Sequence, residues 1–206
     1  MFRSRLAIPF LILTLTLFST ILVRATSPEA AAQATAAGAD PAPGPSNAAR
    51  IARGEYLVSF GGCNDCHTPW KLGPKGPEPD MSRALSGHPA QLTMPTAPAL
   101  PPGPWVWTAA GTNTAFAGPW GVSFTANLTP DRETGLGDWT EEMFIATMKT
   151  GRHQGKGRPL LPPMPYFNLK ELSDQDIRAV FAYLQSLEPV HNRVPAPIDP
   201  EEEAGR

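Results

Sequence analysis

The segment Cys63-Asn64-Asp65-Cys66-His67 constrains this chain more than any other feature, because it contains the only two cysteines among 206 residues. The pattern C-x-x-C-H is the attachment sequence of c-type haem. Two thiols within one turn can each form a thioether with a vinyl group on one edge of the porphyrin, and the histidine that follows is placed to bind the iron. The motif therefore predicts one covalent haem, attached through Cys63 and Cys66, with His67 as an axial ligand.

Three other uses of a close cysteine pair fit the sequence less well. A thioredoxin-like dithiol is expected beside a β-α-β pattern, which the sequence lacks. A zinc site needs two further ligands at matched spacing, whereas the remaining histidines are widely separated, at His88, His153 and His191. A plain disulfide leaves His67 without a role. Covalent haem is therefore the interpretation that we favour.

A six-coordinate iron needs a second axial ligand, for which Met164 is the favoured candidate. It lies in the segment 160–166, LLPPMPY, where prolines on both sides hold the chain extended and rigid. Such a loop presents a thioether at a fixed distance with little ordering cost. Met143 and Met148 fall on a predicted helix and are typical core residues. The candidates that stay open are His88, His153, His191, Met81 and Met94.

The first 25 residues predict export across a membrane. Arg3 and Arg5 precede an uncharged, mostly apolar run over residues 6–23. This pattern fits a cleaved signal peptide or an uncleaved membrane anchor. Either one places the remaining chain in the periplasm, soluble or anchored to the outer face of the inner membrane by residues 6–23. Residues 26–46 are rich in Ala and Pro without large apolar side chains, which predicts a disordered linker.

The charge balance argues against one class of partner. The net charge is −2, and the first 25 residues contain three arginines and no acid, so the exported part is more acidic still. Nucleic-acid binding relies on Lys and Arg that neutralise phosphates. The sequence therefore predicts no nucleic-acid partner.

Three segments carry the periodic apolar pattern of helices, each with a capping residue at its start. The third also has a capping box, in which Ser173 is followed three positions later by Asp176. Gly151 and Pro189 are expected to end the second and third helices. The three segments and their caps are 47–60 with Asn47, 139–150 with Thr140, and 173–188 with Ser173.

The stretch over residues 68–120 reads as a long irregular insertion. Prolines and glycines are scattered through it, with Trp105, Trp107 and Trp120 among them, and it contains no convincing strand pair. We expect a cytochrome-sized domain over residues 47–192, interrupted by this insertion. Residues 193–206 end in EEEAGR, which predicts a flexible tail.

Over residues 50–190 the sequence resembles class I cytochrome c. More closely, it is similar to the haem modules in cytochrome c subunits of membrane-bound quinoprotein alcohol dehydrogenases and related sugar-acid dehydrogenases. Two features depart from that branch: those subunits usually carry several haem motifs, and the stretch between His67 and Asn127 is longer here. The matching stretches are Arg53-Gly54-Glu55-Tyr56-Leu57, Thr125-Ala126-Asn127-Leu128-Thr129-Pro130-Asp131, Thr134-Gly135 through Trp139, and Met164-Pro165-Tyr166.

The resemblance implies an all-α class I cytochrome c fold around one covalently bound haem, with the Pro/Gly/Trp-rich stretch as an insertion. It implies that the first and last helices cross tightly, with Gly54 facing Tyr183 or its neighbours. It also implies His67 and Met164 as the axial pair. Asn127 and Arg158 would lie near the haem edge, where amide and guanidinium groups bind propionates. For Arg158 a solvated charge is an equal alternative.

These expectations favour a periplasmic electron carrier rather than an enzyme. Met/His ligation raises the reduction potential and fills both axial positions, so no substrate reaches the iron. Single electrons would pass to and from redox protein partners such as a dehydrogenase, an oxidase or a cytochrome complex. Two alternatives stay open: a haem-binding structural or sensor subunit of a larger oxidoreductase, and a peroxidase-like enzyme with an open iron site.

Overall fold

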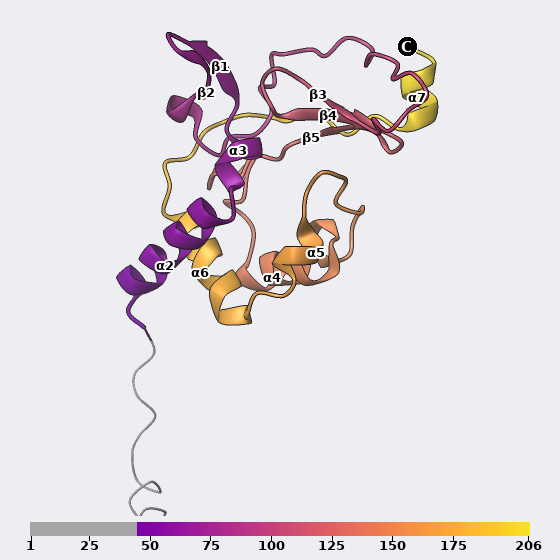
Figure 1. The fold of residues 1–206 in the computed structure, drawn as a ribbon. Helices are drawn as coiled ribbons and strands as arrows, with labels where there is room; N and C mark the ends of the chain where they lie inside the picture. The colour runs from indigo at the N-terminus through magenta and orange to yellow at the C-terminus, as the bar shows by residue number, and fades with distance from the viewer. Residues whose placement is uncertain (1–44) are drawn as a thin grey trace, which may run out of the picture. The chain divides into compact units, whose positions relative to one another are not determined.

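The computed structural model describes residues 45–206 (Figure 1). The predicted signal or anchor over residues 1–25, and the linker up to residue 44, lie outside the described residues. Among the helices of the described range, none is both long and apolar enough to cross a membrane.

Three helices form the larger packed part of the domain, and their caps follow the sequence signals. Thr140 and Ser173 accept backbone hydrogen bonds from Met143 and Asp176, as predicted. The first helix is capped by Ser46, one residue before the predicted Asn47, because the Ser46 hydroxyl accepts the Ala49 N–H. These helices are α2 (Asn47–Phe60), α4 (Glu141–Thr150) and α6 (Asp174–Gln185).

Helices α2 and α6 cross at Gly54, as the resemblance implied (Figure 1). A Cβ atom on Gly54 would lie 2.0 Å from the Ala179 carbonyl oxygen and 2.7 Å from Tyr183 Cβ. Both distances are too short for any side chain. The glycine therefore permits backbone contact between the two helices, which outweighs its cost to helix stability of about 1 kcal/mol.

A single apolar cluster joins the three helices. Phe144 of α4 packs against Phe181 of α6, with ring centroids 5.2 Å apart. Leu85 belongs to the insertion but is buried in the same cluster, so the insertion is attached to the helical core at that point. The buried members of the cluster are Val58, Leu85, Leu136, Phe144, Ile177, Phe181 and Leu184.

The fold is not all-α, and the expectation that residues 68–120 lack strand pairs is wrong. Two antiparallel sheets lie over residues 70–124, so the insertion extends past residue 120 to Phe124; one sheet has two strands and the other has three, in the order β3-β4-β5. The strands are β1 (Trp70–Gly73), β2 (Gly76–Pro79), β3 (Thr108–Ala109), β4 (Ala115–Gly118) and β5 (Gly121–Phe124).

Two of the three hairpins in these sheets use the same turn sequence, Gly-Pro-x-Gly. It occurs as residues 73–76 between β1 and β2, and as residues 118–121 between β4 and β5. Proline presets the backbone at the first loop position, and the last glycine has positive φ, +121° at Gly76 and +86° at Gly121. The strands are too short for a clear apolar alternation, so this repeated turn was the signal that could have revealed them.

The C-terminal segment differs from the expected flexible tail. Ile198 exchanges two backbone hydrogen bonds with Val122, of 2.8 and 2.9 Å, and so extends the β3-β4-β5 sheet by one bridge. The chain then forms the short helix α7 (Pro200–Ala204), where Glu203 accepts the Ala97 N–H at 2.5 Å. Figure 1 shows α7 beside the sheet. Residues 193–206 are therefore attached to the insertion.

Candidate haem site

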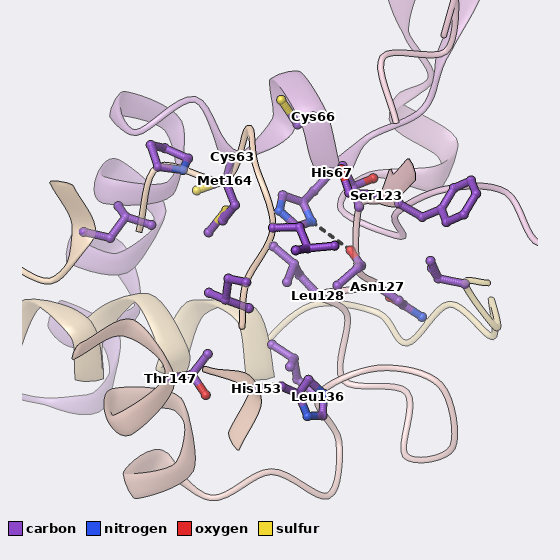
Figure 2. Close-up of a pocket in the computed structure, with 18 of the residues that line it drawn as sticks. Cys63, Cys66, His67, Ser123, Asn127, Leu128, Leu136, Thr147, His153 and Met164 are labelled. Carbon is purple, nitrogen blue, oxygen red and sulfur yellow. Dashed lines mark hydrogen bonds between the residues drawn. The ribbon is translucent and has the colours of Figure 1, made fainter. Parts of the chain in front are cut away.

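A cavity of about 650 Å³ lies between the helical core and the insertion. Its volume falls within the range of small-molecule and cofactor sites, about 300–1,000 Å³. The thiols, imidazole and thioether singled out from the sequence all line it (Figure 2). Most of the remaining wall is apolar, with contributions from both regions that include Leu57, Phe116, Leu128, Leu136, Phe144 and Ile177.

The two cysteines are carried by α3 (Cys63–His67), a helix of little more than one turn. It begins after Gly62, whose φ of +65° lies in the left-handed region that glycine adopts readily. Both thiols are free and half-buried. Burial raises the pKa of Cys63 to about 11 and also raises that of Cys66. Both are therefore protonated at neutral pH, unlike the low-pKa thiolates of redox-active or metal-binding cysteines.

His67 is buried, and its ring has a fixed orientation. Nδ1 lies 2.8 Å from the Ala126 carbonyl oxygen, which only accepts hydrogen bonds, so Nδ1 carries the proton and donates it. Burial lowers the pKa of the imidazole and keeps it neutral. Nε2 is then left with its lone pair, which is the form that binds a metal.

Met164 lies on the cavity wall near Cys63 and His67 (Figure 2). Its backbone N–H donates to the Leu161 carbonyl at 3.2 Å, and its carbonyl accepts the Tyr166 N–H at 2.9 Å as α5 (Tyr166–Leu169) begins. The thioether is the soft ligand that occurs opposite histidine in c-type cytochromes. The four groups and the apolar wall therefore fit a covalently attached haem.

The structure places some of the other candidate ligands away from the cavity and others on its wall. His88 is fully buried away from the cavity, and both of its ring nitrogens are 3.0 Å from partners, Thr114 Oγ1 and the Leu92 carbonyl. His191 is mostly exposed beside Asp131. Met81 is also mostly exposed. The cavity wall does include two of the other residues considered, Met148 and His153.

A zinc centre has no support in the described part of the chain. Over residues 45–206, no group of three or more His, Cys, Asp and Glu side chains is arranged to hold a metal ion. Structural zinc sites need four such ligands.

A family model described as cytochrome c matches residues 51–188. The chain belongs to the cytochrome c family. Members attach haem through the C-x-x-C-H motif, so this cytochrome carries haem c bound covalently. The match also supports the class I cytochrome c fold for the helical part, to which the strands of residues 70–124 are added.

Three relatives of this cytochrome are components of dehydrogenases. It is 34% identical to a nicotinate dehydrogenase subunit of Pseudomonas putida, over 48% of this chain and 10% of that protein. It is 31% identical to the cytochrome c subunit of the quinone alcohol dehydrogenase of Gluconobacter oxydans, over 72% of this chain and 24% of that subunit. It is 30% identical to the gluconate 2-dehydrogenase cytochrome c subunit of Pantoea cypripedii, over 66% of this chain and 23% of that subunit.

These comparisons confirm the similarity to cytochrome c subunits of alcohol and sugar-acid dehydrogenases that the sequence motifs indicated. They also show a difference in size. The cytochrome spans about a quarter or less of the length of each of these relatives.

Asn127 is buried at the cavity, but its amide is engaged within the protein. Nδ2 donates to the Val190 carbonyl at 2.8 Å and to Thr134 Oγ1 at 3.2 Å, while Oδ1 accepts from both the backbone and the hydroxyl of Thr129. These bonds join the loop after β5 to the chain that follows α6. The propionate role expected for Asn127 stays a prediction, and its observed contacts are with the protein.

Arg158 also lines the cavity and is an exposed residue at its edge. Its Nη1 donates to the carbonyl of the neighbouring Pro159 at 3.3 Å, and the cation has no acidic side chain as an ion-pair partner among the described residues. Both of the roles expected for Arg158 therefore stay open.

Two residues that sequence reasoning missed act on the site. The Ala126 carbonyl orients His67, and Ser123 hydrogen-bonds the loop that carries Met164. Every residue has a backbone carbonyl, so residue type cannot reveal one that orients a ligand. Ala126 does, however, fall within one of the stretches that carried the family resemblance. Ser123 had no signal, because its role depends on β5, which the sequence did not reveal.

Proposed function

We propose that this chain is a periplasmic electron carrier with one haem, which passes single electrons between redox protein partners. The observation that carries the proposal is the position of His67 and Met164 on one mostly apolar cavity that also contains both motif cysteines. A site with two protein ligands on the iron has no open position for a substrate, which favours electron transfer over catalysis.

Each residue has a distinct role in this proposal. Cys63 and Cys66 would hold the haem by thioether bonds, and His67 and Met164 would bind its iron. The hydrogen bond from His67 Nδ1 to the Ala126 carbonyl keeps Nε2 available and raises its basicity as a ligand. When bound, the haem supplies one-electron iron chemistry, and the soft thioether favours the ferrous form.

The apolar wall and the cavity edge have further roles. Leu57, Phe144 and Ile177 keep water away from the iron, so little solvent reorganises when the charge changes. We propose that Arg158 pairs with a carboxylate of the haem at the exposed edge. We do not extend this role to Asn127, because its amide already has protein partners.

The partners and the location are also part of the proposal. The names of the relatives are those of dehydrogenase components, so we propose a dehydrogenase as the electron donor and an oxidase or another cytochrome as the acceptor. Because residues 1–25 fit a signal peptide or a membrane anchor, we propose that this exchange takes place in the periplasm. The second candidate, a fixed subunit of a larger oxidoreductase, predicts purification as a stoichiometric complex rather than as a free carrier.

Visible spectra of the full-length holoprotein test the ligand assignment. The oxidised wild type is expected to be low-spin, with the weak near-red band of a sulfur-to-ferric-iron bond, and Met164→Ala is expected to lose this band. The reduction potential of the variant should also fall, because the thioether that favours ferrous iron is removed.

Met148→Leu is the matched comparison, because Met148 is a second thioether on the same cavity and leucine conserves its volume. It is expected to keep the near-red band. Loss of the band in Met148→Leu, with retention in Met164→Ala, would assign the ligand to Met148. A high-spin wild type would favour an enzyme with an open iron site.

A further inference from the structure

The loop that carries Met164 has few backbone donors with which to hold its place. Three of the five residues over 161–165 are prolines, which have no N–H. Of the two remaining donors, the Met164 N–H is used within the loop, on the Leu161 carbonyl. Hydrogen bonds from this loop to distant parts of the protein therefore depend largely on its carbonyl groups.

One such attachment is present, and it comes from the insertion. The buried hydroxyl of Ser123, on strand β5, donates to the Pro162 carbonyl at 2.6 Å. Among the described residues, no other hydrogen bond joins 161–165 to a segment beyond the adjoining α5. The Phe116 carbonyl is also near the hydroxyl, at 3.4 Å. Because a hydroxyl has one proton, the shorter contact with Pro162 takes it.

Ser123 is itself held in place from several sides. The Trp120 indole Nε1–H donates to its hydroxyl oxygen at 3.3 Å, which leaves the hydroxyl proton for Pro162. Its strand pairs with β4 on one side, and on the other the neighbouring Val122 exchanges two backbone hydrogen bonds with Ile198. The serine is therefore fixed on a strand that has partners along both edges.

We propose that Ser123 is a positioning residue for the axial methionine: the sheet of the insertion, through the Ser123–Pro162 hydrogen bond, holds the methionine loop against the haem cavity. This inference rests on the proposed role of Met164 as a ligand. It gives the insertion and the C-terminal segment a function in the redox site, which is to keep the thioether bound when the loop would otherwise open.

Imidazole competition in the full-length ferric holoprotein measures how often the loop opens. Imidazole binds the iron only when the thioether has left, so its apparent affinity rises with the open population. Ser123→Ala removes the hydrogen bond and leaves a carbonyl without its partner. We expect about tenfold tighter apparent imidazole binding, equivalent to about 1.4 kcal/mol, together with a lower reduction potential.

Three variants sharpen this test. Ser123→Thr keeps a hydroxyl and is expected to stay within about twofold of wild type. Ser86→Ala removes another buried serine hydroxyl that donates to a backbone carbonyl, Arg83 at 2.8 Å, away from the methionine loop, and should leave imidazole binding unchanged. Trp120→Phe removes the indole donor behind Ser123, together with part of the ring volume, and should shift binding about twofold in the same direction as Ser123→Ala. Trp120→Phe is the variant to measure if Ser123→Ala does not incorporate haem.

Unchanged imidazole affinity in Ser123→Ala, or equal shifts in Ser123→Ala and Ser86→Ala, would overturn the inference alone. Retention of the near-red band in Met164→Ala would overturn the ligand assignment, and the inference with it. The two failures are distinguished because the first leaves the Met164→Ala result intact.

Discussion

The helical part and the insertion form opposite walls of the haem cavity, but they are stabilised in different ways. Helices α2, α4 and α6 meet through buried apolar side chains and a close backbone contact at Gly54. The insertion contributes few side chains to that cluster. It relies instead on polar contacts: the Asn192 amide donates to the Ser86 carbonyl 106 positions away, and Asp80 pairs with the nearby Lys71 and Arg83. The helical part is thus stabilised mainly by apolar packing, and the insertion mainly by hydrogen bonds and ion pairs.

The largest expected effect tests the packing of the helical part. Gly54→Ala puts a methyl group 2.0 Å from the Ala179 carbonyl oxygen, so α2 and α6 must separate. We expect a loss of at least about 3 kcal/mol in the free energy of unfolding, measured by urea denaturation of the holoprotein. Gly111→Ala in the insertion is the control, because an added Cβ has no atom within 4 Å. An equal loss in both variants would contradict the importance of the crossing.

An intermediate effect tests the polar connections of the insertion. The buried Asn192 amide donates to the Ser86 and His88 carbonyls at 2.6 and 2.9 Å, and accepts the Ala90 N–H at 2.9 Å. Asn192→Ala leaves these backbone groups without partners, at a cost of about 2 kcal/mol. Hydrogen exchange should show a loss of protection over residues 84–90 that exceeds the loss in α6.

Asn168→Ala is the matched control for that experiment, because Asn168 is exposed and its side chain makes no hydrogen bond within the described residues. It should alter stability by no more than about 0.5 kcal/mol. Equal loss of protection in α6 and the insertion of the Asn192 variant would show that the two regions unfold as one unit.

The smallest effect is a dependence on pH within the insertion. Hydrogen bonds from Ser82 and Lys71, with a further one from Arg83, hold the pKa of Asp80 far below its usual value. A depressed carboxyl pKa stabilises the fold above the unfolded value of about 3.9, and that contribution is lost as the pH falls further. Asp80→Asn should therefore lower stability by about 1 kcal/mol at neutral pH, because the two cations are partly exposed.

Urea denaturation at several pH values measures this effect, and the difference between wild type and Asp80→Asn should shrink below about pH 4. Asp138→Asn provides the comparison, since its ion pair with Arg132 is largely exposed. A constant difference across the acid range would mean that Asp80 acts through its shape rather than its charge.

The sequence alone determined the features that depend on neighbouring residues. The haem motif occupies five consecutive positions, and the caps at Thr140 and Ser173 act within one turn of their helices. Gly54 was also recognised, through the family resemblance. Such features are recognisable because the residue types that the chemistry requires lie next to one another or at a fixed helical spacing.

Tertiary structure decided the rest, because the partners are distant in sequence and residue type does not identify them. The His67 imidazole reaches a carbonyl 59 positions away, and Ser123 meets Pro162 across 39 positions. The sheet that carries Ser123 is made of strands of two to four residues, too short for a period to be read. The chain's own sequence thus specified that a haem is bound, while the folding of the insertion and C-terminal segment specified what surrounds its ligands.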